Sequence, residues 1–165
     1  MKYISTYSSP LGEMFMASAD GETLCGLWFD VQNHMQRDMA SAQTNDGLFP
    51  FEQTRHWLDI YFSGENPDFL PPMNPEGTLF RKEVWKLLLE IPYGSTTTYG
   101  QLAARIASAH GCATMSAQAV GGAVGHNPIS VIVPCHRVIG TDGRLTGYNG
   151  GLYLKSSLLN LEQKT

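Results

Sequence analysis

The tripeptide Cys135-His136-Arg137 places a nucleophile, a proton acceptor and a cation next to one another. A cysteine attacks as its thiolate, and because its free pKa is about 8.5 it needs a nearby base or positive field at neutral pH. His136 can supply the base and Arg137 the field. Pro134 precedes the cysteine, so we expect Cys135 at a chain reversal where its side chain can face a pocket. The pattern predicts a thiol nucleophile.

Two adjacent residues do not establish this chemistry by themselves. A free cysteine is among the most buried residue types and is commonly inert. In an extended segment neighbouring side chains point to opposite faces, so His136 reaches Cys135 only through a turn or a bridging water. From this pair alone, a packed inert thiol and a nucleophile both remain open.

The elements that must position Cys135 can be read on both sides of it. Residues 129–133 are apolar and mostly β-branched, which predicts a short buried strand. Residues 140–151 are rich in glycine and predict a loop. Residues 152–162 then predict a closing helix with leucines available to a core.

Three further helices are expected between the middle of the chain and the cysteine. Residues 79–91 have apolar side chains on one face and end at Pro92. Thr98 and Gln101 form a capping-box pattern that starts a helix at Tyr99. Residues 116–125 predict a short helix of almost only small residues. The last two helices suggest a helix-turn-helix, a pair that commonly binds DNA but is often only a packing unit.

The N-terminal half has a different pattern. Residues 3–8, 14–19 and 23–29 alternate in part and predict a small antiparallel meander, and residues 50–62 predict a helix that covers it. Four prolines within residues 66–77 predict an extended connector. The sequence therefore predicts an α+β chain: residues 1–75 form a domain with a small antiparallel sheet and a helix, and residues 76–165 form a mainly helical domain.

Charge is distributed unevenly along the 165 residues. The formal charge is −4, but residues 1–79 hold three basic and eleven acidic residues, whereas residues 80–165 hold eight basic and four acidic ones. A basic half is compatible with a phosphate-bearing partner, and a merely dipolar globule is the alternative.

No stretch approaches the roughly 18 apolar residues of a membrane helix. Three widely spaced cysteines suggest neither a disulfide framework nor a zinc knuckle, which favours a reducing cytoplasm.

One string within the second half resembles a known family. The sequence GHNPISVIVPCHRVIG at residues 125–140 is similar to the active-site segment of O6-alkylguanine-DNA alkyltransferases, also called methylated-DNA–protein-cysteine methyltransferases. Asn127-Pro128 upstream and Gly147-Tyr148 downstream strengthen the match. The similarity extends from about residue 80 to residue 162, and residues 9–12 resemble the family's opening, RNase H-like domain.

The resemblance implies a reaction and four residues that carry it. Cys135 is implied to accept an alkyl group from O6-alkylguanine, and possibly O4-alkylthymine, in a single irreversible turnover without a cofactor. His136 is implied to act as its base through a water, with Glu162 holding the imidazole. Asn127 is implied to stabilise the turn that presents the thiol. Taken alone, Glu162 could equally be a solvated charge and Asn127 a helix cap.

The resemblance also implies contacts with double-stranded DNA and no obligatory protein partner. Tyr99 is expected to press on the phosphate while the damaged nucleotide is flipped out. The small helix, through Ala119 and Gly121, is expected to approach the minor groove closely. Gln118 stands where the family often has an arginine that fills the gap left by the base, so weaker DNA binding is expected. The guanine pocket is expected to be lined by Tyr148, Asn149 and the backbone of Cys135 and Val138, with Lys155 nearby.

Metal binding is not expected, because Ala19 stands where the zinc-binding members of the family carry a cysteine. Two other classes of function remain to be weighed. A binding module for alkylated DNA would need no thiol, and the presence of Cys135 speaks against it. A thiol-dependent acyl-transfer enzyme would need only Cys135 and His136, but it leaves the helix-turn-helix and the uneven charge unexplained.

Overall fold

The computed structural model describes residues 2–31 and 39–164. Contacts within the chain divide them into two compact units. The first contains the chain up to Glu76 together with Pro128–Ser130 and the C-terminal residues from Leu161 onward. The second contains Gly77–Asn127 and Val131–Asn160. The two-domain division at residue 75 stays a prediction, and each unit is described separately below.

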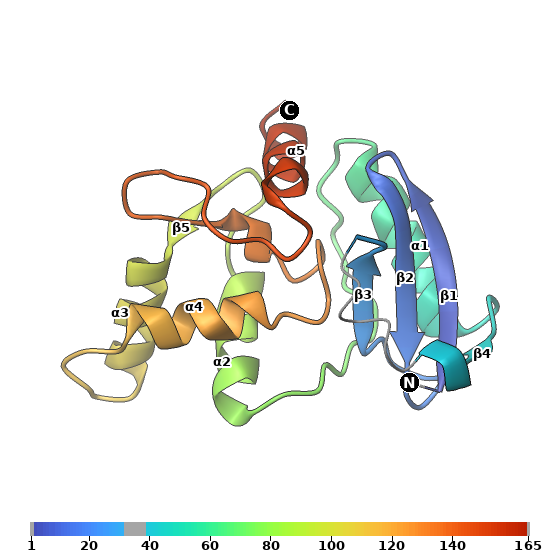
Figure 1. Cartoon of the computed structure of the whole chain (residues 1–165), viewed down its shortest axis with the longest axis horizontal. Coiled ribbons are helices and arrows are strands. Elements are labelled where there is room, and N and C mark those ends of the chain that lie inside the picture. Colours follow the sequence, from blue (N-terminus) through green and yellow to red (C-terminus); the bar gives the residue numbers. More distant parts are fainter. Residues whose placement is uncertain (1, 32–38, 165) are drawn as a thin grey trace. The chain divides into compact units, whose positions relative to one another are not determined.

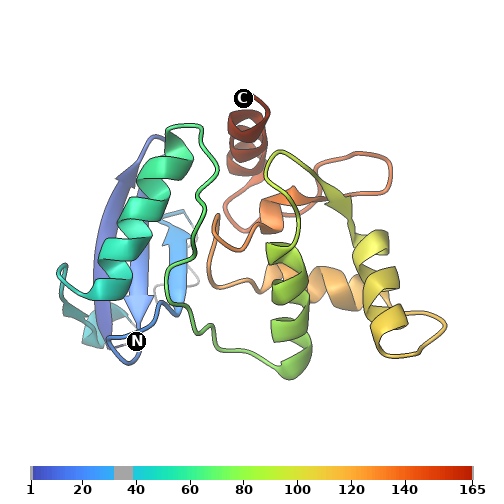
Figure 2. The ribbon, with the colours of Figure 1, turned by 180° about the vertical axis from the view of Figure 1, so that it is seen from behind.

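The first unit is built on a small sheet with the strand order β3-β2-β1-β4. Its strands are β1 (Tyr3–Ser9), β2 (Gly12–Ser18), β3 (Gly26–Phe29) and β4 (Gln43–Thr44). The first three form the antiparallel meander that the sequence predicted, and β4 adds a short parallel pairing to β1. Helix α1 (Phe49–Phe62) packs on one face of this sheet, as two opposite views show (Figures 1 and 2).

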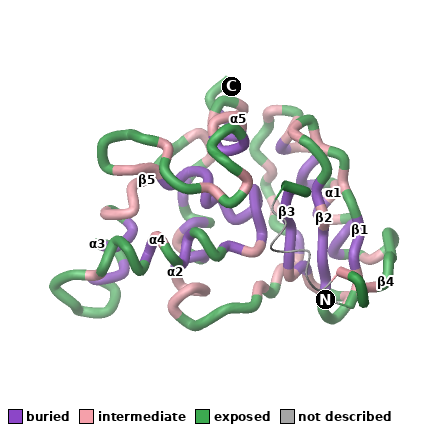
Figure 3. Tube along the Cα trace, in the orientation of Figure 1, coloured by how far each residue is buried: buried purple, intermediate pink, exposed green. Residues whose placement is uncertain are grey.

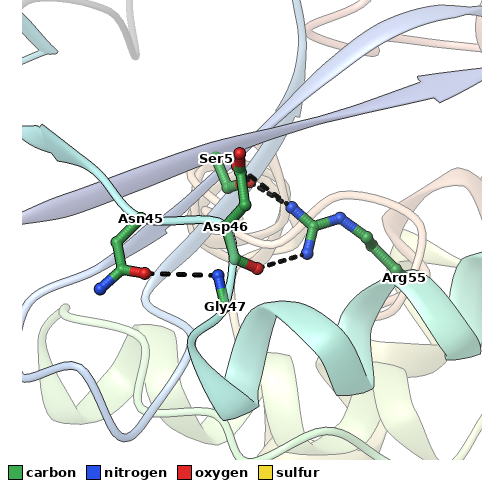
Figure 4. Close-up of polar contacts among 5 residues, drawn as sticks. All are labelled: Ser5, Asn45, Asp46, Gly47 and Arg55. Carbon is green, nitrogen blue, oxygen red and sulfur yellow. Dashed lines mark hydrogen bonds and ion pairs between the residues drawn. The ribbon is translucent and has the colours of Figure 1, made fainter.

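The core of this unit lies between the sheet and α1. Every residue of β3 is buried, and the trace of β2 is largely buried as well (Figure 3). A polar cluster ties the sheet to α1: the Arg55 guanidinium hydrogen-bonds the Ser5 hydroxyl and donates at 2.8 Å to the Asp46 carbonyl (Figure 4). The Ser5 hydroxyl in turn donates to the Asp46 carboxylate. This cluster joins β1, the segment after β4 and α1.

The second unit is mainly helical. Its elements are α2 (Leu79–Leu89), β5 (Thr97–Thr98), α3 (Tyr99–Ala109), α4 (Ala117–Gly125), β6 (Val138–Ile139) and α5 (Leu152–Gln163), whose last residues are grouped with the first unit. The capping box of Thr98 and Gln101 is present at the start of α3. The Ser116 hydroxyl accepts from the Ala119 N–H at the start of α4. Helices α3 and α4 pack together as the expected helix-turn-helix (Figure 1).

The prediction of a strand over residues 129–133 is wrong. The segment is buried as expected, but it forms turns and makes only one isolated bridge, from Ile129 to Leu27. Val131 has a φ of +70°, which is uncommon for a β-branched residue and prevents an extended strand. Hydrophobicity alone does not distinguish a buried strand from a buried turn, because apolar β-branched residues occur in both. The chain therefore reverses before Cys135.

No helix within residues 2–31 and 39–164 has the length and apolar character needed to cross a membrane.

A buried tryptophan joins two helices of the second unit. The indole N–H of Trp85 in α2 donates to the Ala123 carbonyl in α4 at 2.9 Å. We expect Trp85→Phe to lower the free energy of unfolding by about 2 kcal/mol, because it leaves a buried carbonyl without this donor and removes packed volume. Chemical denaturation followed by circular dichroism measures this change.

Trp57→Phe is the matched control. Trp57 is buried in the first unit, and its indole N–H has no hydrogen-bond partner among the described residues. Its replacement removes packing but no hydrogen bond, so a smaller loss is expected. Equal losses in the two variants would show that the Trp85 hydrogen bond contributes nothing.

Candidate functional site around Cys135

Cys135 opens a single turn of 3-10 helix, Cys135–Arg137, that follows the buried reversal. Its backbone N–H donates to the Val133 carbonyl at 2.8 Å. The residue is 9% exposed and His136 is fully buried. Because the backbone turns here, the two side chains are not held on opposite faces as they would be in a strand.

Asn127 supports this reversal from the end of α4. Its side-chain Nδ2 donates to the Val133 carbonyl at 2.8 Å, and its side chain also hydrogen-bonds the Cys135 thiol. Its backbone N–H donates to the Val124 carbonyl, which ends the helix. Asn127 is 5% exposed, so these bonds are shielded from water. The helix end and the thiol are therefore joined through one amide side chain.

Lys155 is completely buried in α5. Its Nζ donates to the carbonyl oxygens of Val138 at 2.6 Å, Thr146 at 2.8 Å and Gly147 at 3.4 Å. An ammonium group has three donors, so three backbone acceptors satisfy it without a carboxylate. The side chain thus joins α5 to β6, which follows the reactive turn, and to the loop of residues 140–151.

The electrostatics of the thiol follow from these contacts. Burial raises the pKa of the Cys135 thiol above its ordinary value, because desolvation penalises the thiolate. The hydrogen bond from Asn127 and the positive charge of Lys155 act in the opposite direction but do not cancel it. Burial likewise lowers the pKa of Lys155, and the Cys135 thiolate opposes that shift. The two groups stabilise each other's charged form.

Arg137 has a role that its position beside the cysteine did not predict. Its Nη1 donates to the Ile91 carbonyl at 2.8 Å, just beyond the end of α2. Its guanidinium carbon lies 5.7 Å from the centre of the Tyr93 ring, a cation–π arrangement. Arg137 therefore anchors the reactive turn to the segment after α2.

The glycine-rich loop is tied to both helices of the helix-turn-helix. The Tyr99 hydroxyl, at the start of α3, donates to the Thr146 carbonyl at 3.3 Å, the same oxygen that Lys155 contacts. The Asn149 side chain donates to the Gly125 carbonyl at the end of α4. These ties place the loop between the helix pair and α5 within this unit.

Helix α4 presents small residues to solvent. Gln118, Ala119 and Gly122 are exposed, and a Cβ added at Gly122 would meet no atom within 4 Å. Gly121 faces inward instead, since a Cβ there would lie 3.7 Å from the Tyr99 ring. Gln118 carries the longest side chain of this exposed face.

Glu162 lies in the part of α5 grouped with the first unit. It is 2% exposed, so the interpretation as a solvated charge is wrong. The Tyr61 hydroxyl of α1 donates to its Oε1 at 2.8 Å. Of the other predicted residues, Val138 is buried in β6, Tyr148 is half-buried and Asn149 is exposed.

The sequence missed two groups that bind predicted residues: the Tyr61 hydroxyl, which donates to Glu162 within the first unit, and the Thr146 carbonyl, which accepts from Lys155 within the second. Tyr61 has the spacing of an ordinary core residue of α1, and a backbone carbonyl leaves no signal in a sequence. Among the parts of this site, only the Pro-Cys-His-Arg motif and the capping box at Thr98 have patterns that can be recognised in the local sequence. In residues 2–31 and 39–164 no group of three or more His, Cys, Asp or Glu side chains is arranged to hold a metal ion.

Comparisons with known proteins cover nearly the whole chain. Residues 79–164 match the family model described as 6-O-methylguanine DNA methyltransferase, DNA binding domain, and residues 2–75 match its ribonuclease-like domain. A methylated-DNA–protein-cysteine methyltransferase of Methanosarcina barkeri is 49% identical over 98% of this chain and 97% of its own. The Haemophilus influenzae protein of that name is 42% identical over 98% and 86%.

A solved structure shares the fold. The crystal structure of Mycobacterium tuberculosis OGT in complex with DNA superposes with a TM-score of 0.84 at 40% identity, covering 98% of this chain and 92% of that one. The α+β fold, the helix-turn-helix and the Cys-His turn place the chain in the class of DNA methyltransferases that these models describe. The chain belongs to the methylated-DNA–protein-cysteine methyltransferase family.

The raised pKa of Cys135 predicts its reactivity toward a small neutral alkylating reagent. Free cysteine reaches half of its plateau rate at its pKa of about 8.5. The rate at Cys135 should continue to rise at higher pH, because burial keeps the thiol protonated. Lys155→Met should move the midpoint higher still. Mass spectrometry that resolves each cysteine measures both midpoints, and a midpoint at or below that of free cysteine contradicts the electrostatic argument.

Proposed function

We propose that this chain repairs O6-alkylguanine in DNA by transferring the alkyl group to the sulfur of Cys135. The observation that carries the proposal is the buried thiol, held by Asn127 and faced by the charge of Lys155, within the part of the chain that matches the family's DNA-binding domain. O4-alkylthymine is a further proposed substrate, because its alkyl group is bonded to an equivalent exocyclic oxygen.

The proposed reaction is an in-line displacement. His136 takes the proton of Cys135 through a water, and Glu162 stabilises the resulting imidazolium. The thiolate then attacks the alkyl carbon, the carbon–O6 bond breaks, and guanine leaves with the electron pair and accepts a proton. Hydrogen-bond donors near the departing oxygen favour this step. The product thioether is stable to water, so each molecule acts once and no cofactor is needed.

The proposed engagement with DNA uses the helix-turn-helix. A buried thiol reaches a base only if the nucleotide is flipped out of the stack. We propose that Tyr99 presses on the phosphate during that rotation. We propose that the exposed small face of α4, with Ala119, lets the helix backbone approach the minor groove of duplex DNA, and that Gly121 on the inner side of the helix allows its close packing on the Tyr99 ring. We propose that the Gln118 side chain fills the space that the flipped base leaves.

The flipped guanine is proposed to lie against the backbone of Cys135 and Val138 and the side chains of Tyr148 and Asn149, with Lys155 holding the wall of this pocket. Lys155 and Val138 are already joined by a hydrogen bond of 2.6 Å. We propose that the protein acts without an obligatory protein partner. Three free cysteines also suit a reducing compartment, which supports a cytoplasmic location.

The stoichiometry of methyl transfer tests the proposed reaction. With excess O6-methylguanine DNA, transfer should reach a plateau near one methyl group per chain, because the thioether is not cleaved. Intact mass spectrometry reads the number of groups, and peptide analysis reads the acceptor. Cys135→Ala should accept none, whereas Cys112→Ala, which removes an exposed thiol, should behave as the parent. Sustained turnover, or acceptance by Cys135→Ala, refutes the proposal.

Gln118→Arg tests the assignment of the exposed face of α4. An arginine adds a fixed charge and a stacking plane, so DNA affinity should rise on the order of tenfold, or about 1.4 kcal/mol. Fluorescence anisotropy with a labelled duplex at fixed salt measures it. The control is Gln43→Arg, which adds the same charge to exposed strand β4 of the first unit. Equal affinities for Gln118→Arg and the control would remove Gln118 from the interface.

A further inference from the structure

A buried hydrogen bond in the first unit involves a residue to which the proposed function gives no task. Tyr61 lies near the end of α1 and is completely buried. Its hydroxyl donates to Glu162 Oε1 at 2.8 Å, although the two residues are 101 positions apart in the sequence. Glu162 is itself 2% exposed. A carboxylate is rarely buried away from water without hydrogen-bond partners. The Tyr61 hydroxyl is one such partner of Glu162.

The surroundings of Tyr61 keep its hydroxyl in place. Its ring stacks on Trp57 with centroids 5.2 Å apart and meets the edge of Phe62 at 5.3 Å. These contacts hold the ring, so the hydroxyl cannot turn away from Glu162 without disturbing the core. A neutral phenol donates a hydrogen bond to an ionised carboxylate, and that bond favours the ionised form and a single orientation.

We infer that Tyr61 is a positioning residue for the alkyl transfer, holding the Glu162 carboxylate ionised and oriented. The inference rests on the proposed function, in which Glu162 stabilises the imidazolium that forms when His136 takes the proton of Cys135. Tyr61 keeps its own proton throughout and touches no reacting atom.

The test is the rate of benzyl transfer from free O6-benzylguanine, a probe that removes DNA binding from the measurement. Tyr61→Phe keeps the ring and removes one hydrogen bond to a charged group, so the rate at neutral pH should fall about tenfold. Without the donor, Glu162 keeps its proton to higher pH, and the acidic limb of the rate profile should move to higher pH. Loss of packing alone would not move that limb.

Tyr7→Phe is the matched control. The Tyr7 hydroxyl also donates to a carboxylate, Asp59 Oδ1, at 2.7 Å within the same unit, but it does not contact Glu162. This variant should leave the rate and its pH profile unchanged. In a Glu162→Gln background, Tyr61→Phe should produce no further loss, because the group through which it acts is already absent.

Three results would overturn the inference: a parental rate and pH profile in Tyr61→Phe, an equal loss in Tyr7→Phe, or a full additional loss in the Glu162→Gln background. If Tyr61→Phe does not fold, 3-fluorotyrosine at position 61 keeps the shape and strengthens the donor. The acidic limb should then move to lower pH, and an unmoved limb contradicts the inference. Failure of the parent itself to accept a benzyl group refutes the proposed function instead.

Discussion

The buried ammonium group of Lys155 is the interaction on which the second unit's site depends. Its hydrogen bonds to the carbonyls of Val138 and Thr146 join α5 to the strand after the reactive turn and to the glycine-rich loop. A charge in this place is costly unless several acceptors surround it, so its presence requires that the backbone around Cys135 take one particular course. The same charge favours the thiolate. One side chain therefore contributes to both the shape and the electrostatics of the site.

Burial of the thiol has two opposing consequences for an alkyl acceptor. It raises the pKa of Cys135 and so keeps the sulfur protonated in the free protein. It also protects a nucleophile that can be used only once from unrelated electrophiles and oxidants, whose attack needs an accessible thiolate. Asn127 and Lys155 reduce the cost of ionisation without abolishing it. In the proposed mechanism, His136 takes the proton when a substrate is bound and so offsets the remaining cost of forming the thiolate.

The core of the acidic first unit contains a carboxylate from the end of α5. The Tyr61 hydroxyl of α1 donates to Glu162 at 2.8 Å. A hydroxyl and a carboxylate that are both buried depend on each other, because neither can find water as an alternative partner. The packing of α1 thus fixes the surroundings of a carboxylate in the last helix.

The sequence by itself determined the capping box at Thr98 and nearly all helix positions, because these depend on neighbours within a few residues along the chain. It did not determine the course of residues 129–133, since their apolar, β-branched character suits a buried strand and a buried turn alike. Only the tertiary structure decided that the backbone reverses at Val131, that Lys155 faces backbone carbonyls and that Tyr61 meets Glu162. Those contacts join distant parts of the chain, and several end on backbone oxygens, which every residue possesses and no sequence pattern distinguishes.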